Sequence, residues 1–147
     1  MQEEFSGIER RLQRLDESLQ RLEALSGLAQ DDFLGDADLR DIVERNLEVA
    51  AQCCIDIAHR IVSLEGAPGP RDAHESLLRL GEVGVLDPAF AREFSPVAGF
   101  RNVLAHEYLS IDWNLVYAHL QELESMHRYA AAIRNWLSEK GAGPART

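Results

Sequence analysis

Apolar residues recur at alternating steps of three and four near the start of the chain. This period places them on one narrow face of an α-helix. The intervening positions are mostly Arg, Gln, Glu and Asp, so the other faces of this helix should contact water. We therefore expect an amphipathic first helix that packs antiparallel against a neighbouring helix. Its apolar seam consists of Phe5, Ile8, Leu12, Leu15, Leu19 and Leu22.

A second and wider apolar repeat follows a polar break at residues 26–35. Asp36 can cap the start of this helix, because a carboxylate accepts hydrogen bonds from the free N–H groups of a first turn. The repeat continues to Leu64, and the loop EGAPGP at 65–70 then ends the helix. A long helix that is apolar over a wide arc is typical of the centre of a bundle.

The following segment predicts two shorter helices. One covers about residues 71–80. Another begins at Asp87-Pro88, since Asp is a good N-cap and Pro suits the first helical position. Ser95-Pro96 falls inside the pattern of this second helix, so the helix should be kinked or restarted there. The restarted piece runs from about residue 96 to residue 108.

A last helix is predicted from Trp113 to Leu137, with Asp112 as its cap. No segment of the chain alternates between apolar and polar residues as a strand does. We therefore predict an all-α fold, an up-and-down bundle of four to five helices. Residues 1–140 should form a single domain, and residues 141–147, rich in Gly and Pro, a flexible tail.

The composition is that of a globular protein, with 46% hydrophobic and 27% charged residues. No run approaches the roughly 18 apolar residues of a membrane helix, and the N-terminal residues lack the apolar centre of a signal peptide. We therefore expect a cytoplasmic protein that binds no membrane. The formal net charge of −10 argues against broad binding to nucleic acid, because phosphate affinity comes from clustered Lys and Arg. Any contact with RNA must be local.

The two cysteines, Cys53 and Cys54, are adjacent in the sequence. Neighbours on a helix point about 100° apart, so this pair suits neither a structural disulfide nor chelation of a metal. We interpret both as thiols of the core or of an interface.

The segment GFRNVLAHEYLSID at residues 99–112 crowds polar and reactive side chains into two turns of an otherwise apolar helix. Asn102 and His106 are four apart and share a face. Arg101 and His106 differ by about 140° around the helix axis, but a long Arg side chain can reach towards a shared pocket. Metal-free cleavage of RNA needs an acid, a base and a cation for the charged phosphorane, which His and Arg can supply. On spacing alone, an Arg, a His and a Tyr at a helix end are more often a capping and packing cluster than a catalytic site.

A single His106 cannot act as base and acid in the same step without help from water or another group. A twofold axis would bring a second His106 into the same cleft. We therefore hypothesise that the site forms across a homodimer.

The stretch RNVLAHEY resembles the R-x4-H-x-Y signature of the HepT-like toxins, formerly grouped as DUF86, within the HEPN superfamily. The resemblance extends over about residues 36–137, including the central helix and the segment LGEVGVLDPAFAREFSPVAGFRN. It implies a HEPN-like helical dimer that acts as the ribonuclease toxin of a toxin–antitoxin pair. The cognate antitoxin of that family is a nucleotidyltransferase of the MntA type, which silences the toxin by transferring AMP to the motif tyrosine.

The resemblance also implies a role for each motif residue. Arg101 would bind phosphate, His106 would be the general base or acid, and Asn102 would orient His106 or the scissile group. Tyr108 would accept AMP and could also hold substrate. Asp56, on the central helix, could orient His106 or Arg101, although a surface carboxylate is an equal interpretation. The substrate would be tRNA or mRNA.

Two other functions remain open. The chain could be a catalytically silent HEPN scaffold that binds a nucleotide or its nucleotidyltransferase partner, or a plain helical interaction protein. A metal site is not expected, because Asp56 and His59 lack the second Glu-x-x-His motif of di-iron bundles. We expect no cofactor. His74, His119 and His127 lie among Glu and Arg and should be solvated.

Overall fold

The computed structural model describes residues 2–66 and 68–140, and within these ranges it contains eight helices and no strand. The predicted all-α class is confirmed. The tail expected at residues 141–147 lies outside the described residues. The helices are α1 (Gln2–Leu25), α2 (Gln30–Leu34), α3 (Ala37–Leu64), α4 (Ala73–Glu82), α5 (Pro88–Phe94), α6 (Val97–His106), α7 (Trp113–Leu120) and α8 (Glu124–Glu139).

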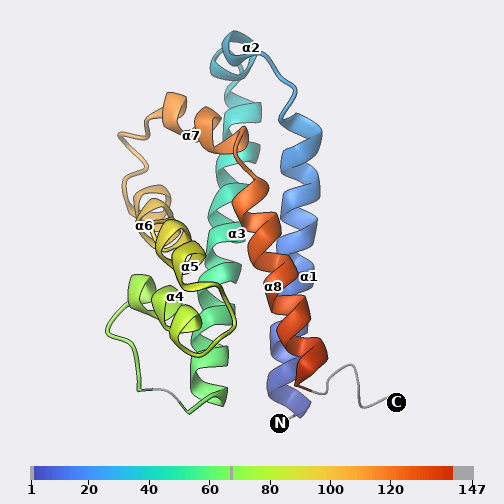
Figure 1. The fold of residues 1–147 in the computed structure, drawn as a ribbon. Helices are drawn as coiled ribbons and strands as arrows, with labels where there is room; N and C mark the ends of the chain where they lie inside the picture. The colour runs from blue at the N-terminus through green and yellow to red at the C-terminus, as the bar shows by residue number, and fades with distance from the viewer. Residues whose placement is uncertain (1, 67, 141–147) are drawn as a thin grey trace.

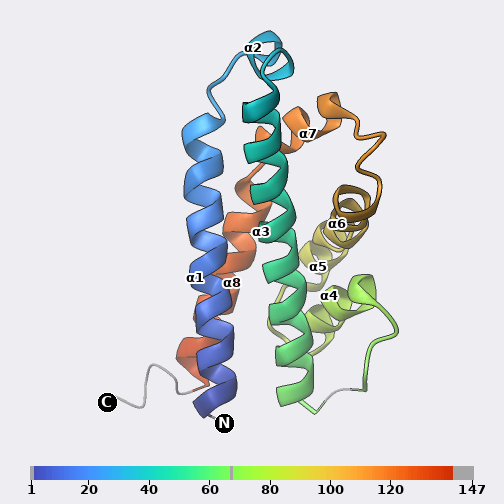
Figure 2. The same ribbon diagram turned by 180° about the vertical axis from the view of Figure 1, so that it is seen from behind.

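Three long helices, α1, α3 and α8, lie side by side and form the body of the bundle (Figures 1 and 2). The chain runs up α1 and down α3, so the antiparallel packing predicted for the first helix is confirmed. The short helices α4 and α6 pack on the side of α3 that faces away from α1, and α5 packs on α4 (Figure 1). Helix α7 crosses near the end of the bundle where α2 lies.

The seam of α1 is buried against α3 along its whole length. All six of its predicted residues are at most 7% exposed. Helix α3 buries residues on about half of its circumference, which confirms its central position. Each fully buried aliphatic side chain contributes about 1.5–3 kcal/mol to the free energy of unfolding, so this pair of helices is a main source of stability. The buried residues of α3 are Val43, Asn46, Leu47, Ala50, Ala51, Cys53, Cys54, Ile55, Ile57, Ala58, Ile61 and Val62.

A buried tyrosine joins α8 to the centre of the bundle. The Tyr129 hydroxyl donates a hydrogen bond of 2.7 Å to the carbonyl of Cys54. Its ring stacks on Phe94 of α5 with the ring centres 4.8 Å apart. Burial raises the pKa of the Tyr129 phenol well above its ordinary value, so the hydroxyl remains a donor. Cys53 and Cys54 are both buried free thiols, in agreement with the prediction.

Aspartate side chains cap the helices where the sequence predicts them. Asp36 accepts hydrogen bonds from the backbone N–H groups of two residues at the start of α3, and Asp87 and Asp112 do the same for α5 and α7. The helix predicted near residues 71–80 begins at Ala73, with Asp72 as its N-cap. The restart at Ser95-Pro96 is also confirmed, since α5 ends before it and α6 begins after it.

Near the beginning and near the end of the chain, two boundary predictions are wrong. The break at 26–35 contains the short helix α2, which exists because Phe33 is completely buried. The single last helix is divided into α7 and α8. Contacts distant in sequence hold α7 in place: the Tyr117 hydroxyl donates to the carbonyl of Leu28, and the Gln121 amide donates to the carbonyl of Ser26. No Gly or Pro marks this division, so the local sequence does not show it.

In the part of the chain that the structure describes, no helix is both long enough and apolar enough to span a bilayer.

Three carboxylates, Asp41, Glu44 and Glu48, follow one another along one side of α3. Burial, together with the charges of Glu48 and Asp41, raises the pKa of Glu44 from 4.5 to about 7, and Arg45 opposes this only in part. A hydrogen bond between Glu44 and Glu48 also favours the protonated form of Glu44. One proton is therefore held at this side of α3 up to neutral pH.

We expect the free energy of unfolding to fall as pH rises from about 4.5 to about 7. Glu44 loses its proton near pH 4.5 in the unfolded chain but keeps it to about 7 in the folded protein, so the folded state binds the extra proton across this window. In Glu44→Gln this dependence should shrink, and the variant should be more stable than wild type at pH 8. Urea unfolding at several pH values measures both effects. Glu17→Gln, an exposed position on α1, is the control, and an unchanged pH slope in Glu44→Gln would contradict the interpretation.

Candidate functional site

Helix α6 carries three of the four predicted motif residues, and the fourth follows directly after it. Arg101, Asn102 and His106 lie on α6, which ends because Glu107 leaves the helical conformation with φ −111° and ψ 44°. Tyr108 therefore lies in the turn that leads to α7, and its side chain is 72% exposed. The predicted helix 96–108 is thus two residues too long at its C-terminal end.

Asn102 and His106 lie on the outward face of α6. They share this face with Gly99, because positions 99, 102 and 106 are separated by three and four residues. All three are exposed. The side chains of Asn102 and His106 are therefore accessible to a large ligand such as RNA.

Arg101 points to a different side of α6 from His106, about 140° away around the axis. Its side chain is partly buried, and its Nε is buried without a hydrogen-bond partner among the described residues. No hydrogen bond in the described part of one chain joins Arg101 to His106. Arg101 consequently has donor capacity that its own chain does not use, and a buried donor without a partner costs free energy.

The structure of one chain does not bring Asp56 to the motif. Its carboxylate accepts a hydrogen bond of 2.8 Å from Gln52 and lies 3.8 Å from the guanidinium of Arg11 on α1. Leu47, also on α3, lines a cavity beside α6. Asp56 is nine residues further along the helix, so its side chain points about 180° away from that of Leu47. Within one chain Asp56 thus joins α3 to α1, as expected of a surface carboxylate.

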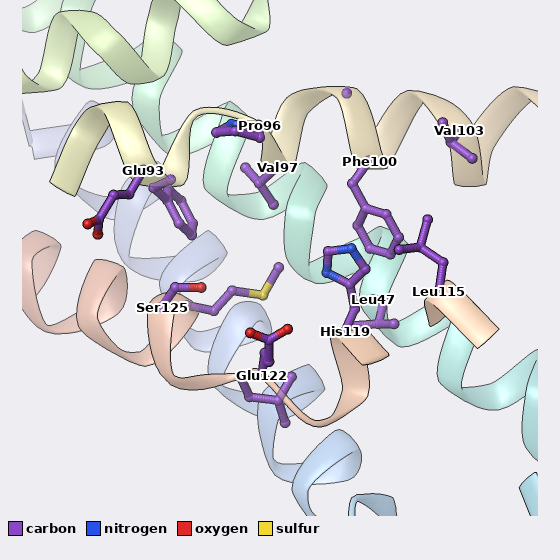
Figure 3. Close-up of a pocket in the computed structure, with 14 residues that line it drawn as sticks. Leu47, Glu93, Pro96, Val97, Phe100, Val103, Leu115, His119, Glu122 and Ser125 are labelled. Carbon is purple, nitrogen blue, oxygen red and sulfur yellow. The ribbon is translucent and has the colours of Figure 1, made fainter. Parts of the chain in front are cut away.

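The histidines predicted to be solvated make specific contacts. The ring of His119 stacks on Phe100 of α6, with the ring centres 3.8 Å apart (Figure 3). Burial lowers the pKa of His119, so its imidazole is neutral near pH 7. The prediction is wrong for His119. His74 Nε2 lies 2.9 Å from the Ser95 hydroxyl, whereas His127 pairs at the surface with Glu23.

A cavity of about 380 Å³ lies beside α6, between α5, α7 and the first turn of α8 (Figure 3). Sequence reasoning did not identify it, because its walls come from five helices that only the fold brings together. The pairing of Phe100 with His119 likewise depends on the fold. Among residues 2–66 and 68–140, no group of three His, Cys, Asp or Glu side chains is arranged to hold a metal.

The eight-helix fold, with an exposed R-x4-H-x-Y segment at the end of a restarted helix, defines a HEPN-type domain. A family profile for ribonuclease HepT-like proteins matches residues 15–133. The chain belongs to the ribonuclease HepT-like family.

Two relatives are similar to this chain in sequence, and two solved structures are similar to it in fold. A tRNA nuclease HepT of Aphanizomenon flos-aquae is 31% identical over 131 residues, 88% of this chain and 89% of the relative. An mRNA nuclease HepT of Shewanella oneidensis is 28% identical over 96 residues, 63% of this chain and 72% of the relative. A solved tri-AMPylated HEPN toxin of Shewanella oneidensis, in complex with MNT antitoxin, has a TM-score of 0.78 at 22% identity, covering 87% of this chain and 96% of that chain. The cytosolic protein YutE of Bacillus subtilis, of unknown function, has a TM-score of 0.77 at 17% identity, covering 92% and 91%.

Replacing Asp56→Asn should leave nuclease activity unchanged. The amide oxygen of Asn can still accept from Gln52, and only the partly exposed ion pair with Arg11 is lost. We expect the free energy of unfolding to fall by at most about 1 kcal/mol. Urea unfolding and an RNA-cleavage assay on the same preparation measure the two effects. Normal stability together with lost cleavage would instead make Asp56 a positioning residue of the motif.

Proposed function

We propose that this chain is the toxin of a toxin–antitoxin pair, an endoribonuclease that cleaves RNA without a metal ion and is silenced by transfer of AMP to Tyr108. The observation that supports this proposal most directly is the exposure of His106 and Tyr108 at the end of α6, in a chain of the ribonuclease HepT-like family. The relatives named as nucleases act on tRNA and on mRNA, so either class is a candidate substrate.

Each motif residue has a separate role in the proposed cleavage of the phosphodiester. The His106 imidazole can take the proton of the attacking 2′-hydroxyl or give one to the leaving oxygen. Arg101 offers an always-charged guanidinium for the phosphate and its developing charge. Asn102, on the same face of α6 as His106, orients the imidazole or the scissile group. These steps need no metal Lewis acid.

A homodimer would complete the site. Arg101 and His106 of one chain point to different sides of α6, so one chain does not present them together. A second copy with its α6 facing the first would bring two His106 side chains into one cleft, where one acts as base and the other as acid. Large apolar side chains near the motif are exposed and suit such an interface: Tyr108 at 72%, Leu109 at 89% and Leu115 at 44%.

Modification of Tyr108 would block the site by charge and by size. An AMP group adds a negative phosphate and a nucleoside two residues from His106, where the phosphate of RNA would bind. The solved structure of the Shewanella oneidensis HEPN toxin carries such groups and binds an MNT antitoxin. We propose the same class of nucleotidyltransferase as the partner of this chain.

The net charge of −10 confines contact with RNA to the neighbourhood of the motif. Affinity should therefore depend on the shape and local charge of the cleft more than on a broad basic surface. This favours an enzyme with a restricted RNA target.

A catalytically silent scaffold is the second candidate. Arg101 and His106 of one chain lie on different sides of α6, and this observation favours the scaffold. A chain that never dimerises would lack an assembled site. Both functions keep Tyr108 as the acceptor, and they differ in whether His106 is needed.

Changing His106→Ala should reduce RNA cleavage by at least about 100-fold, because the proton-transfer group is lost. The measurement is cleavage of total tRNA and of mRNA by purified protein in EDTA, together with growth on induction in cells. His59→Ala, an exposed histidine on α3, is the control and should cleave like wild type. Equal cleavage by the wild type and the His106→Ala variant would refute the catalytic role. Absence of cleavage and of toxicity in every variant would support the silent scaffold, and loss of wild-type cleavage in EDTA would refute metal independence.

Changing Tyr108→Phe should abolish AMP incorporation and retain cleavage, because the substitution removes only the acceptor hydroxyl. The measurement is transfer of label from α-labelled ATP by an MNT-type nucleotidyltransferase. Tyr117→Phe is the matched control, since the Tyr117 hydroxyl is already engaged as a donor to Leu28. Label retained by the Tyr108→Phe protein would place the modification elsewhere.

A further inference from the structure

The cavity beside α6 is open to solvent on one side and apolar inside. Its apolar lining includes Phe94, Val97, Phe100, Leu123 and Met126, and Figure 3 shows the residues around it. Its volume of about 380 Å³ is in the range of sites that bind small organic molecules. An apolar cavity of this size favours a ligand with an apolar body.

Two aromatic rings contribute to one wall of the cavity. Phe100 and His119 stack face to face and present their edges to it, and Gly99 and Val103 extend this wall along α6. Burial keeps His119 uncharged near pH 7, so it adds no positive charge to the space. A planar ring can lie against such a surface in an offset or edge-on arrangement.

Two carboxylates give the cavity its charge. The Glu122 carboxylate points into the space between α6 and α8, and that of Glu93 lies at its outer edge (Figure 3). In the described part of the chain, neither carboxylate has an ion-pair partner within 4.0 Å. The cation in the adjoining hollow, Arg128, is engaged over the ring of Phe90 at 4.2 Å. An acidic group beside an apolar cavity selects a positively charged ligand.

We propose that this cavity is a binding site for a small organic cation, a molecule with a flat apolar body and a protonated amine. The body lies against Phe100 and His119, and the amine approaches the carboxylate of Glu122. The cavity borders the outward face that carries Asn102 and His106, because Gly99 belongs to both, but neither Asn102 nor His106 lines it. The cavity borders α6, so its occupant contacts Phe100, the residue before Arg101 in the sequence.

The same charges argue against other occupants. The phosphates of a nucleotide or of RNA would be repelled by Glu122 and Glu93, so the cavity does not suit the nucleotide-binding scaffold considered above. A second copy of this chain could cover the cavity through the exposed Leu115, and a partner protein could insert a Lys or Arg side chain. The half-enclosed shape favours the small molecule.

The test uses the purified full chain and three probes with one ring system. 1-Naphthylmethylamine carries the cation, 1-naphthalenemethanol is neutral and 1-naphthoic acid is anionic at pH 7. We expect the amine to bind roughly tenfold more tightly than the alcohol, and the acid to bind most weakly. Calorimetry gives the affinities, and NMR shift changes at Phe100 and Met126 identify the site.

Variants separate the contribution of charge from that of shape. Glu122→Gln should bring the affinity for the amine close to that for the alcohol, and the affinity for the alcohol should not change. The control Glu17→Gln on α1 should change neither affinity. Gly99→Leu should weaken all binding, because a side chain at this position enters open space beside the cavity and meets no atom within 4 Å at its Cβ. Circular dichroism and urea unfolding establish that each variant is folded.

Several outcomes would overturn the proposal. These are equal affinity for the three probes, preference for the amine that survives Glu122→Gln, and shift changes away from the cavity. Absence of binding of the three probes at every concentration would also overturn it. Because none of these measurements depends on RNA cleavage or AMP transfer, their failure is distinct from failure of the proposed function.

Discussion

The packing of α1 on α3 is the contact on which the rest of the structure depends. It excludes water from the seam of α1 and fixes the rotation of α3 about its axis. The opposite side of α3 is then presented to the short helices α4, α5 and α6. Loss of this contact would release α3 to rotate, and the position of α6 with its motif would no longer be defined.

Features of the fold that depend on local chemistry were predictable from the sequence. The seam of α1 and the caps at Asp36, Asp87 and Asp112 depend on periodicity and on free N–H groups within one or two turns. The restart at Ser95-Pro96 follows from the missing N–H of proline and its clash with the preceding turn. The division between α7 and α8 was not predictable, because it depends on hydrogen bonds from Tyr117 and Gln121 to carbonyls about 90 residues earlier in the chain.

In the candidate site, too, only the features that depend on local sequence were predictable. The motif residues and their order are visible in the sequence, and the shared face of Asn102 and His106 follows from their spacing. The placement of Asp56 beside Arg11 was not visible, since a helix residue can face any neighbour until the bundle is known. The stack of His119 on Phe100 depends on the crossing of α7 over α6, which no local pattern encodes. In the described part of one chain, Arg101 and His106 lie on different sides of α6, as their spacing of five residues indicates.

The position of Tyr108 has a consequence for the timing of regulation. Its turn is anchored at one end by α6 and at the other by the Asp112 cap of α7, yet the side chain itself is exposed. A transferase could therefore reach the hydroxyl on the finished fold, without opening any helix. Silenced and active forms would then differ by a covalent bond alone, and a cell could store the protein already folded, with no refolding step between the stored form and the enzyme.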